Sequence, residues 1–163
     1  MNALIGAERT VNKPILYVMI GPAGSGKSTA SKNLFPNCLR VSTDSIRKEL
    51  FGDEASQQEP AKVFEIAYKS MEDALCNGFS VVFDATNTTA FARKKVINRV
   101  DAIQCRKVAV YMNTPLEECK RRNKTRGRIV PEAVIERQYE QMLRDASSIP
   151  YQFDEIIIME GWK

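Results

Sequence analysis

The sequence predicts an α/β protein in which one parallel sheet of five strands carries helices on both faces. Short apolar runs of strand length alternate along the chain with longer segments of helical periodicity, and parallel strands need such helical crossovers. The apolar runs are nearly continuous, which is typical of strands buried on both faces. The expected strands are residues 15–20, 38–41, 79–83, 107–112 and 154–159.

Most of the expected helices begin or end at a recognisable signal. Pro36 stops the first helix, and Gly52 is the expected C-cap of the second. Thr114 and Glu117 form a capping box at the start of the fifth. Pro131 begins the last helix. The expected helices are residues 27–35, 45–51, 60–76, 89–100, 114–123 and 131–146.

The composition fits one domain with one hydrophobic core. The chain has 163 residues, of which 44% are hydrophobic and 27% charged. We expect residues 1–13 to be a polar lead-in and residues 14–163 to form the folded domain. The net charge of +4 permits an anionic ligand such as a nucleotide or a nucleic acid. Neither a signal peptide nor a membrane-spanning run is evident, so we expect a cytoplasmic protein.

The four cysteines, Cys38, Cys76, Cys105 and Cys119, are far apart and form no Cys-x-x-Cys pair. Because the chain has no histidine, a structural zinc site would need all four thiolates to converge. We therefore expect free thiols that pack as small hydrophobic side chains, with no disulfides.

Between the first strand and the first helix lies Gly21-x-x-x-x-Gly26-Lys27-Ser28, the pattern of a phosphate-binding P-loop. Its glycines let the backbone curl so that N–H groups point at phosphate oxygens, and the helix that follows adds the positive end of its dipole. Lys27 is placed to bridge the terminal phosphates of ATP, and the Ser28 hydroxyl to ligate Mg²⁺. The alternative is a glycine turn that happens to carry a lysine, but such a turn would not require the preceding strand and the following helix. The sequence therefore predicts a P-loop NTPase fold, with the nucleotide at Gly21, Ala23, Gly24, Ser25, Gly26, Lys27, Ser28 and Thr29.

Among P-loop proteins, a small kinase fits best. A GTPase needs an Asn-Lys-x-Asp motif, and the nearest string, which begins at Asn123, lacks the aspartate. A large mechanical ATPase usually carries paired acids after its second phosphate strand, and residues 81–85 carry Asp84 alone.

A kinase must also take a proton from the acceptor hydroxyl, and without histidine the base is expected to be a carboxylate. Asp44 and Asp84 follow expected strands, at the edge where open α/β sheets bind ligands. Asp44 is the candidate base, and the alternative is that it only caps the helix at 45–51. Asp84 is expected to serve Mg²⁺ with Ser28, either directly or by holding water bound to the ion. Arg47, one helical turn beyond Asp44, holds an acceptor phosphate or is a solvated surface arginine.

Residues 120–128 are densely basic. Cations suit the C-terminal end of the helix at 114–123, and this end effect accounts for Lys120, Arg121 and Arg122. Arg126 and Arg128 lie beyond that helix and flank Gly127. We therefore expect a hinged, arginine-bearing lid that closes over the triphosphate.

Together these motifs resemble the kinase domain of phage-type 5′-polynucleotide kinase. The resemblance spans roughly residues 15–145 in colinear order. Ser45 and Ala85 stand where the phage pattern has acids, and both departures fall on the acceptor side. The elements that carry the resemblance are the P-loop, Ser42-Thr43-Asp44-Ser45-Ile46-Arg47, Phe83-Asp84-Ala85-Thr86-Asn87, residues 120–127, residues 130–135 and residues 139–142.

The resemblance implies that Asp44 is the general base for a 5′-hydroxyl and that Arg47 holds the 3′-phosphate of the terminal nucleotide. It also implies that Arg122 and Arg126 act as lid arginines on the ATP phosphates, with Arg126 and Lys27 stabilising the transferred group. Thr86 and Asn87 would lie near the acceptor. The implied function is ATP-dependent transfer of the γ-phosphate to the 5′-hydroxyl of a polynucleotide. Two alternatives remain: a kinase for a sugar, nucleoside or antibiotic, and a nucleotide-binding regulatory module without transfer activity.

Overall fold

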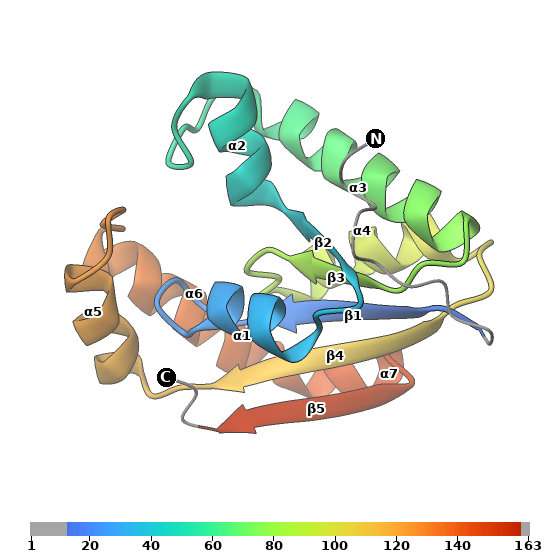
Figure 1. The fold of residues 1–163 in the computed structure, drawn as a ribbon. Helices are drawn as coiled ribbons and strands as arrows, with labels where there is room; N and C mark the ends of the chain where they lie inside the picture. Colours follow the sequence, from blue (N-terminus) through green and yellow to red (C-terminus); the bar gives the residue numbers. More distant parts are fainter. Residues whose placement is uncertain (1–12, 161–163) are drawn as a thin grey trace.

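The structure, a computed structural model, describes residues 13–160. Five parallel strands form one sheet in the order β2-β3-β1-β4-β5 (Figure 1). Each strand differs from its expected bounds by at most two residues, so the predicted α/β fold with a five-stranded parallel sheet is confirmed. The strands are β1 (Ile15–Ile20), β2 (Leu39–Ser42), β3 (Val81–Asp84), β4 (Arg106–Asn113) and β5 (Glu155–Glu160).

The helices cover both faces of the sheet, as predicted. Four of them, α3, α4, α6 and α7, pack on one face, and α1 packs on the other. The short α7 and the 3₁₀ turn before it were not predicted, because so few residues leave no periodic pattern. No helix within residues 13–160 has both the length and the apolar character needed to cross a membrane. The helices are α1 (Lys27–Leu34), α2 (Thr43–Phe51), α3 (Pro60–Cys76), α4 (Ala90–Val100), α5 (Leu116–Lys124), α6 (Glu132–Arg144) and α7 (Ile149–Gln152), with the 3₁₀ turn at Ala146–Ser148.

Alternate residues of the strands build the two apolar layers of the core. Val18 of β1 packs in the layer under α3 and α4, whereas its neighbour Met19 packs in the layer under α1. Because all five strands run in the same direction, their carboxyl ends lie at one edge of the sheet. The loop that leads into α1 leaves from this edge, and α2 follows β2 directly there (Figure 1); this is the edge at which parallel sheets bind ligands.

The start of α2 differs from the prediction. The helix begins at Thr43, and its N-cap is Ser42, whose hydroxyl accepts a hydrogen bond from the Ser45 amide at 3.2 Å. Asp44 therefore lies within the first turn, and its interpretation as the N-cap is wrong. At the other end of the helix Gly52 is the C-cap with φ 74°, as predicted.

The start of α5 also differs. The helix begins at Leu116 and has no side-chain cap. The Thr114 hydroxyl donates instead to the carbonyl oxygen of Ser25 at 2.9 Å. The predicted capping box is therefore wrong, because the loop before α1 uses the threonine that would have capped α5.

All four cysteines are free thiols. Cys105 and Cys119 are buried, and burial raises the pKa of both thiols. Cys76 is exposed, so the expectation that all four pack as hydrophobic side chains is wrong at that position.

Arg93 of α4 is a fully buried cation, with 0% exposure. Burial lowers the pKa of its guanidinium. Its five hydrogen bonds, of 2.7 to 3.1 Å, run to Gln152 Oε1, Ser148 Oγ and the carbonyl oxygens of Asn87, Thr88 and Asp145. One side chain thus joins the loop after β3 to the connection between α6 and α7.

We expect Arg93→Ala to lower the free energy of unfolding by more than about 3 kcal/mol. The substitution leaves buried carbonyl groups without donors and opens a cavity. Urea denaturation measures the loss.

Arg99, on the same helix, is the matched control. It bonds to Glu65 and Glu72, yet its side chain is 30% exposed. Solvent screens such surface pairs, so Arg99→Ala should cost only a small fraction of what Arg93→Ala costs. Equal losses in the two variants would contradict the importance of the buried guanidinium.

Candidate active site

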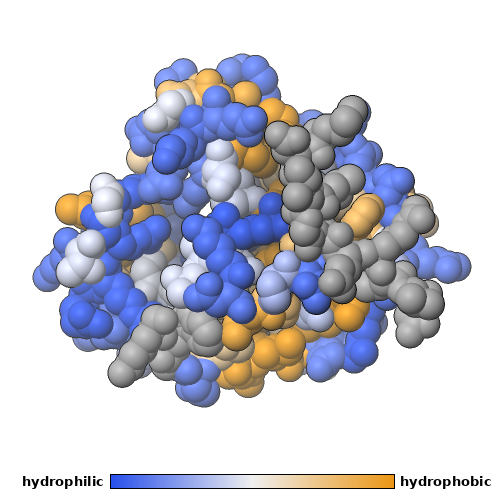
Figure 2. Space-filling model, in the orientation of Figure 1, coloured by the Kyte–Doolittle hydropathy of each residue, from blue (hydrophilic) through white to orange (hydrophobic). Residues whose placement is uncertain are grey.

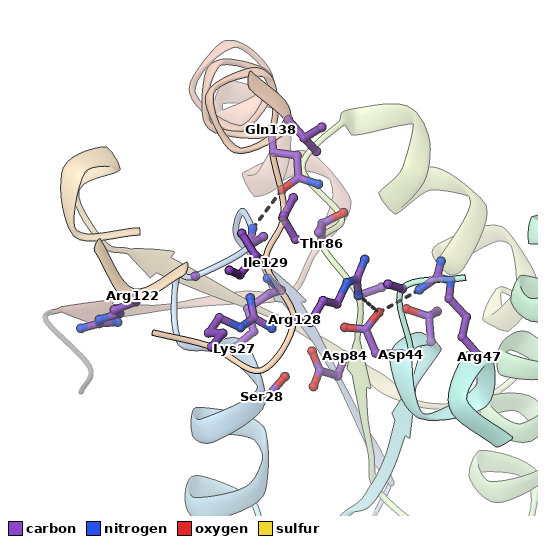
Figure 3. Close-up of a pocket in the computed structure, with 18 of the residues that line it drawn as sticks. Lys27, Ser28, Asp44, Arg47, Asp84, Thr86, Arg122, Arg128, Ile129 and Gln138 are labelled. Atoms are coloured by element: carbon purple, nitrogen blue, oxygen red, sulfur yellow. Dashed lines mark hydrogen bonds and ion pairs between the residues drawn. The ribbon is translucent and has the colours of Figure 1, made fainter. Parts of the chain in front are cut away.

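A cavity of about 750 Å³ opens at the carboxyl edge of the sheet, bordered by α1, α2 and the connection between α5 and α6 (Figure 3). Hydrophilic side chains dominate the surface over the elements that border it (Figure 2). Three residues expected at a ligand, Gly21, Ser25 and Asn87, do not line this cavity. The expected residues that do line it are Ala23, Gly24, Gly26, Lys27, Ser28, Thr29, Asp44, Arg47, Asp84, Thr86, Arg122 and Arg126.

The P-loop has the shape that its glycines require. Gly24 and Gly26 have φ of 81° and 95°, in the left-handed region that other residues rarely adopt. A Cβ atom at Gly24 would also overlap the carbonyl oxygen of Cys119 on α5. Helix α1 has no side-chain N-cap, so the amides of its first turn are left for a ligand.

Three distant elements hold this loop in place. The Gly21 amide donates to the Thr86 carbonyl oxygen at 2.9 Å. The Ala23 amide donates to Gln138 Oε1 of α6, also at 2.9 Å (Figure 3). Thr114 completes the set through its bond to the Ser25 carbonyl. Gln138 was not predicted, because no local pattern marks one glutamine on an amphipathic helix.

Lys27 lies buried beneath the cavity, and its Nζ donates to the Pro22 carbonyl oxygen at 2.9 Å. Burial lowers the pKa of Lys27 to about 8, although the carboxylate of Asp84 opposes this shift. The charge of Arg126 lowers the pKa further. An anion in the cavity would stabilise the charged form of Lys27 and so oppose the effects of burial and of Arg126.

Asp84, at the end of β3, is buried and already paired. Its Oδ2 accepts from Arg40 Nη2 at 2.6 Å and from Ser31 Oγ at 3.1 Å. Its Oδ1 has no hydrogen-bond partner among residues 13–160. Arg40 was not singled out from the sequence, although a charge inside a short, mostly apolar strand was the available signal.

The donor atoms near Asp84 suit a magnesium ion. The Ser28 hydroxyl and the free Oδ1 of Asp84 are hard oxygen donors that border one cavity. Within the described residues, no group of three or more acidic, cysteine or histidine side chains could enclose a metal by itself. Magnesium bound by one or two protein groups together with phosphates and water agrees with this donor set.

Asp44 lies across the cavity from the P-loop, with two arginines on one of its oxygens (Figure 3). Arg47 Nη1 and Arg128 Nη1 each donate to Asp44 Oδ1 at 2.9 Å. Oδ2 has no partner within the described part of the chain, and the side chain is 37% exposed. The carboxylate is therefore held in position with one oxygen available to a ligand.

The connection between α5 and α6 is anchored at both ends by Asn123. Its buried side-chain amide donates to the Val130 carbonyl oxygen at 2.7 Å and accepts from the Val130 amide at 2.9 Å. The predicted lid is thus narrowed to residues 124–129, which carry Arg126 and Arg128. Arg122 lies before this segment, on α5, where it bonds to Glu118 Oε1 at 2.8 Å.

Asn87 has a structural role. It is buried, with φ 46°, and its Nδ2 donates to the carbonyl oxygens of Met19 at 2.9 Å and Ala85 at 3.3 Å. Its expected role toward an acceptor stays a prediction.

The parallel sheet, the P-loop and the surrounding arginines and acids define a protein of the P-loop kinase type. Residues 16–148 match the family model AAA_33, described as an AAA domain, and the chain belongs to this P-loop kinase family.

The individual relatives share less than a third of their aligned residues with this chain. The chain is 28% identical over 149 residues to L-seryl-tRNA(Sec) kinase of Methanococcus maripaludis, covering 86% of this chain and 56% of that protein. It superposes on a chain of the Pnkp1/Rnl/Hen1 RNA repair complex with a TM-score of 0.77 and 24% identity, covering 88% and 48% of the two chains. A gluconokinase from Sinorhizobium meliloti gives 0.57 and 15%, covering 93% and 86%. At these identities the structural likeness concerns the fold. The chain spans about half the length of the first two relatives.

We expect the lid to show an abrupt boundary in hydrogen exchange. The Val130 amide, bonded to the buried Asn123 side chain, should exchange slowly, whereas the amides of residues 127–129 should exchange fast. Addition of a nucleotide should slow only the latter. Exchange followed residue by residue by NMR tests this, and uniform protection across residues 124–130 without nucleotide would contradict a mobile lid.

Proposed function

We propose that this chain is an ATP-dependent kinase that transfers the γ-phosphate to the 5′-hydroxyl of a polynucleotide. The observation that carries the proposal is Asp44, a carboxylate that shares one cavity with the P-loop and has one free oxygen. A protein that only binds nucleotides has no need of such an acid. The resemblance of residues 42–47 to phage-type 5′-polynucleotide kinase supports a nucleic-acid acceptor, and the similarity to a seryl-tRNA kinase supports a substrate that contains nucleic acid.

On the donor side, the P-loop amides and Lys27 bind the β- and γ-phosphates of ATP. Ser28 would hold Mg²⁺ through its hydroxyl, and Asp84 would hold it through its free Oδ1, either directly or by way of a water molecule, since Arg40 and Ser31 already occupy Oδ2. When bound, the ion would neutralise charge on the phosphates. Arg122 and Arg126 contact the same phosphates from the lid side.

On the acceptor side, Asp44 Oδ2 accepts the proton of the 5′-hydroxyl while the oxygen of this hydroxyl attacks the γ-phosphorus. The bond from the γ-phosphorus to the bridging oxygen breaks, and ADP leaves with that oxygen. Arg47 holds the phosphate on the 3′ side of the reacting nucleotide, close to Thr86. Arg128, now on Asp44 Oδ1, keeps the carboxylate oriented.

A small-molecule kinase is the second candidate. A gluconokinase shares the fold over 93% of this chain, and Ser45 and Ala85 depart from the phage pattern on the acceptor side. Transfer of label from γ-labelled ATP to 5′-hydroxyl oligonucleotides, nucleosides and sugars separates the two candidates. Label on sugars or nucleosides alone would replace the polynucleotide proposal, and ATP binding without transfer to any acceptor would indicate a regulatory module.

Asp44→Asn should lower the rate of transfer on the order of 10²–10⁴-fold, because the amide cannot accept the proton. Ser42 caps α2, so the stability and the affinity for ATP should barely change. Asp53→Asn is a matched control, since Asp53 is exposed and accepts from the Ala55 amide. Steady-state rates are measured for both, and near-normal transfer by Asp44→Asn would move the role of base elsewhere.

Nucleotide binding should take up a proton at alkaline pH. Because Lys27 has a pKa of about 8 in the free protein, bound phosphates should raise it. The affinity for ATP should therefore be constant below about pH 8 and fall by up to about tenfold per unit above it. Calorimetry in buffers of different ionisation enthalpy counts the proton, and Lys27→Met should abolish the uptake. Constant affinity from about pH 7 to 9.5 would contradict this assignment.

A further inference from the structure

A second cavity, of about 460 Å³, lies between the first halves of α3 and α4. We call it the α3–α4 groove. Phe64 and Tyr68 line it from α3, and Phe91 lines it from α4. Phe64 also lines the candidate active site, so the groove continues outward from that site. Asn87, next in sequence to the Thr86 that borders the active site, lines the groove.

The two aromatic walls of the groove differ in their support. Tyr68 stacks on the buried Phe83, with ring centroids 5.8 Å apart and planes 12° from parallel, and Phe64 lies 5.9 Å from Tyr68. This wall is therefore fixed to the core. Phe91 is 68% exposed, although burial of a phenylalanine ring is strongly favourable. An exposed ring opposite a fixed aromatic wall suits a flat apolar ligand.

One cation of the groove is available to an anion beside that flat group. Glu65 shares the guanidinium of Arg99 with Glu72, and Arg99 Nη1 and Nη2 donate to Glu65 at 2.7 and 3.0 Å. The ammonium group of Lys95 lies 4.6 Å from the Phe91 ring centroid and has no carboxylate partner within residues 13–160. The groove therefore offers aromatic faces with one unpaired cation.

A single strand of nucleic acid has this combination of planar apolar bases and regularly spaced phosphates. We propose that the α3–α4 groove binds a nucleobase of the acceptor strand, on the 3′ side of the reacting 5′-hydroxyl, between Phe64 and Phe91. Lys95 then contacts the neighbouring phosphate. This inference rests on the proposed function, since it places the 5′-hydroxyl at Asp44. A mononucleotide held at Asp44 occupies the first cavity and leaves the groove empty.

Binding of a hexanucleotide with a free 5′-hydroxyl and a 3′ fluorophore, followed by anisotropy, tests the groove directly. DNA and RNA strands are measured separately. Phe91→Ala should weaken binding about tenfold, the order expected for loss of one base–aromatic stack. Phe91→Tyr should retain it, because tyrosine keeps the ring. Lys95→Gln should make binding less dependent on salt. Tyr151→Ala, at a ring on α7 that is 92% exposed and outside the groove, should change nothing.

Two outcomes would overturn the proposal: no binding of either strand by the wild-type protein, or equal binding by wild type and Phe91→Ala. Equal binding is expected if a protein segment rather than a nucleobase occupies the groove. The proposed kinase function fails separately, when the hexanucleotide binds through Phe91 but receives no label from γ-labelled ATP. A competing 3′-mononucleotide supplies the last check, since its affinity should be the same in wild type and Phe91→Ala.

Discussion

The backbone of residues 21–26 forms no regular helix or strand, so its shape depends on contacts from elements far away in the sequence. Thr86 accepts from its first amide, Gln138 accepts from its third, and Thr114 donates to its fifth carbonyl. The carbonyl of Cys119 leaves room only for a glycine at the fourth position. Curled amides bind phosphate well only when they are already in place. The phosphate site is therefore a property of the whole fold.

The buried guanidinium of Arg93 extends this dependence into the protein interior. It holds the carbonyls of Asn87 and Thr88, which directly follow the Thr86 that supports the P-loop. Its hydrogen-bond partners are carbonyl, amide and hydroxyl oxygens rather than carboxylates. Compared with an apolar side chain of the same volume, such a group fixes geometry more than it adds stability, because desolvation of the charge offsets much of the gain. The loop after β3 and the end of α6 consequently behave as one unit with the phosphate site.

Local periodicity predicted the strands, the parallel sheet and the P-loop, because those features depend on neighbours within a few residues. The N-cap of α2 was misplaced for a local reason, since Ser42 and not Asp44 caps the helix, and local rules also missed the long-range partners of several side chains. Asp44 pairs with Arg128, 84 residues later, and Thr114 bonds to a carbonyl 89 residues earlier. Gln138 acts across 115 residues, and no spacing encodes such a contact. The sequence therefore predicted that acidic residues would follow the strands at the site, but it did not predict which side chains they bond to.

The two hydrogen bonds between the Asn123 side chain and the Val130 backbone also bear on how fast the lid can move. Helix α5 is packed against the P-loop, so only the few residues between Asn123 and Val130 are left to move. Short loops rearrange in nanoseconds to microseconds, whereas hinged domains need microseconds to milliseconds. Kinases typically turn over at about 1–100 per second. Opening of this loop would therefore be fast on that scale, and the pace of a catalytic cycle would be set by chemistry or by departure of the products.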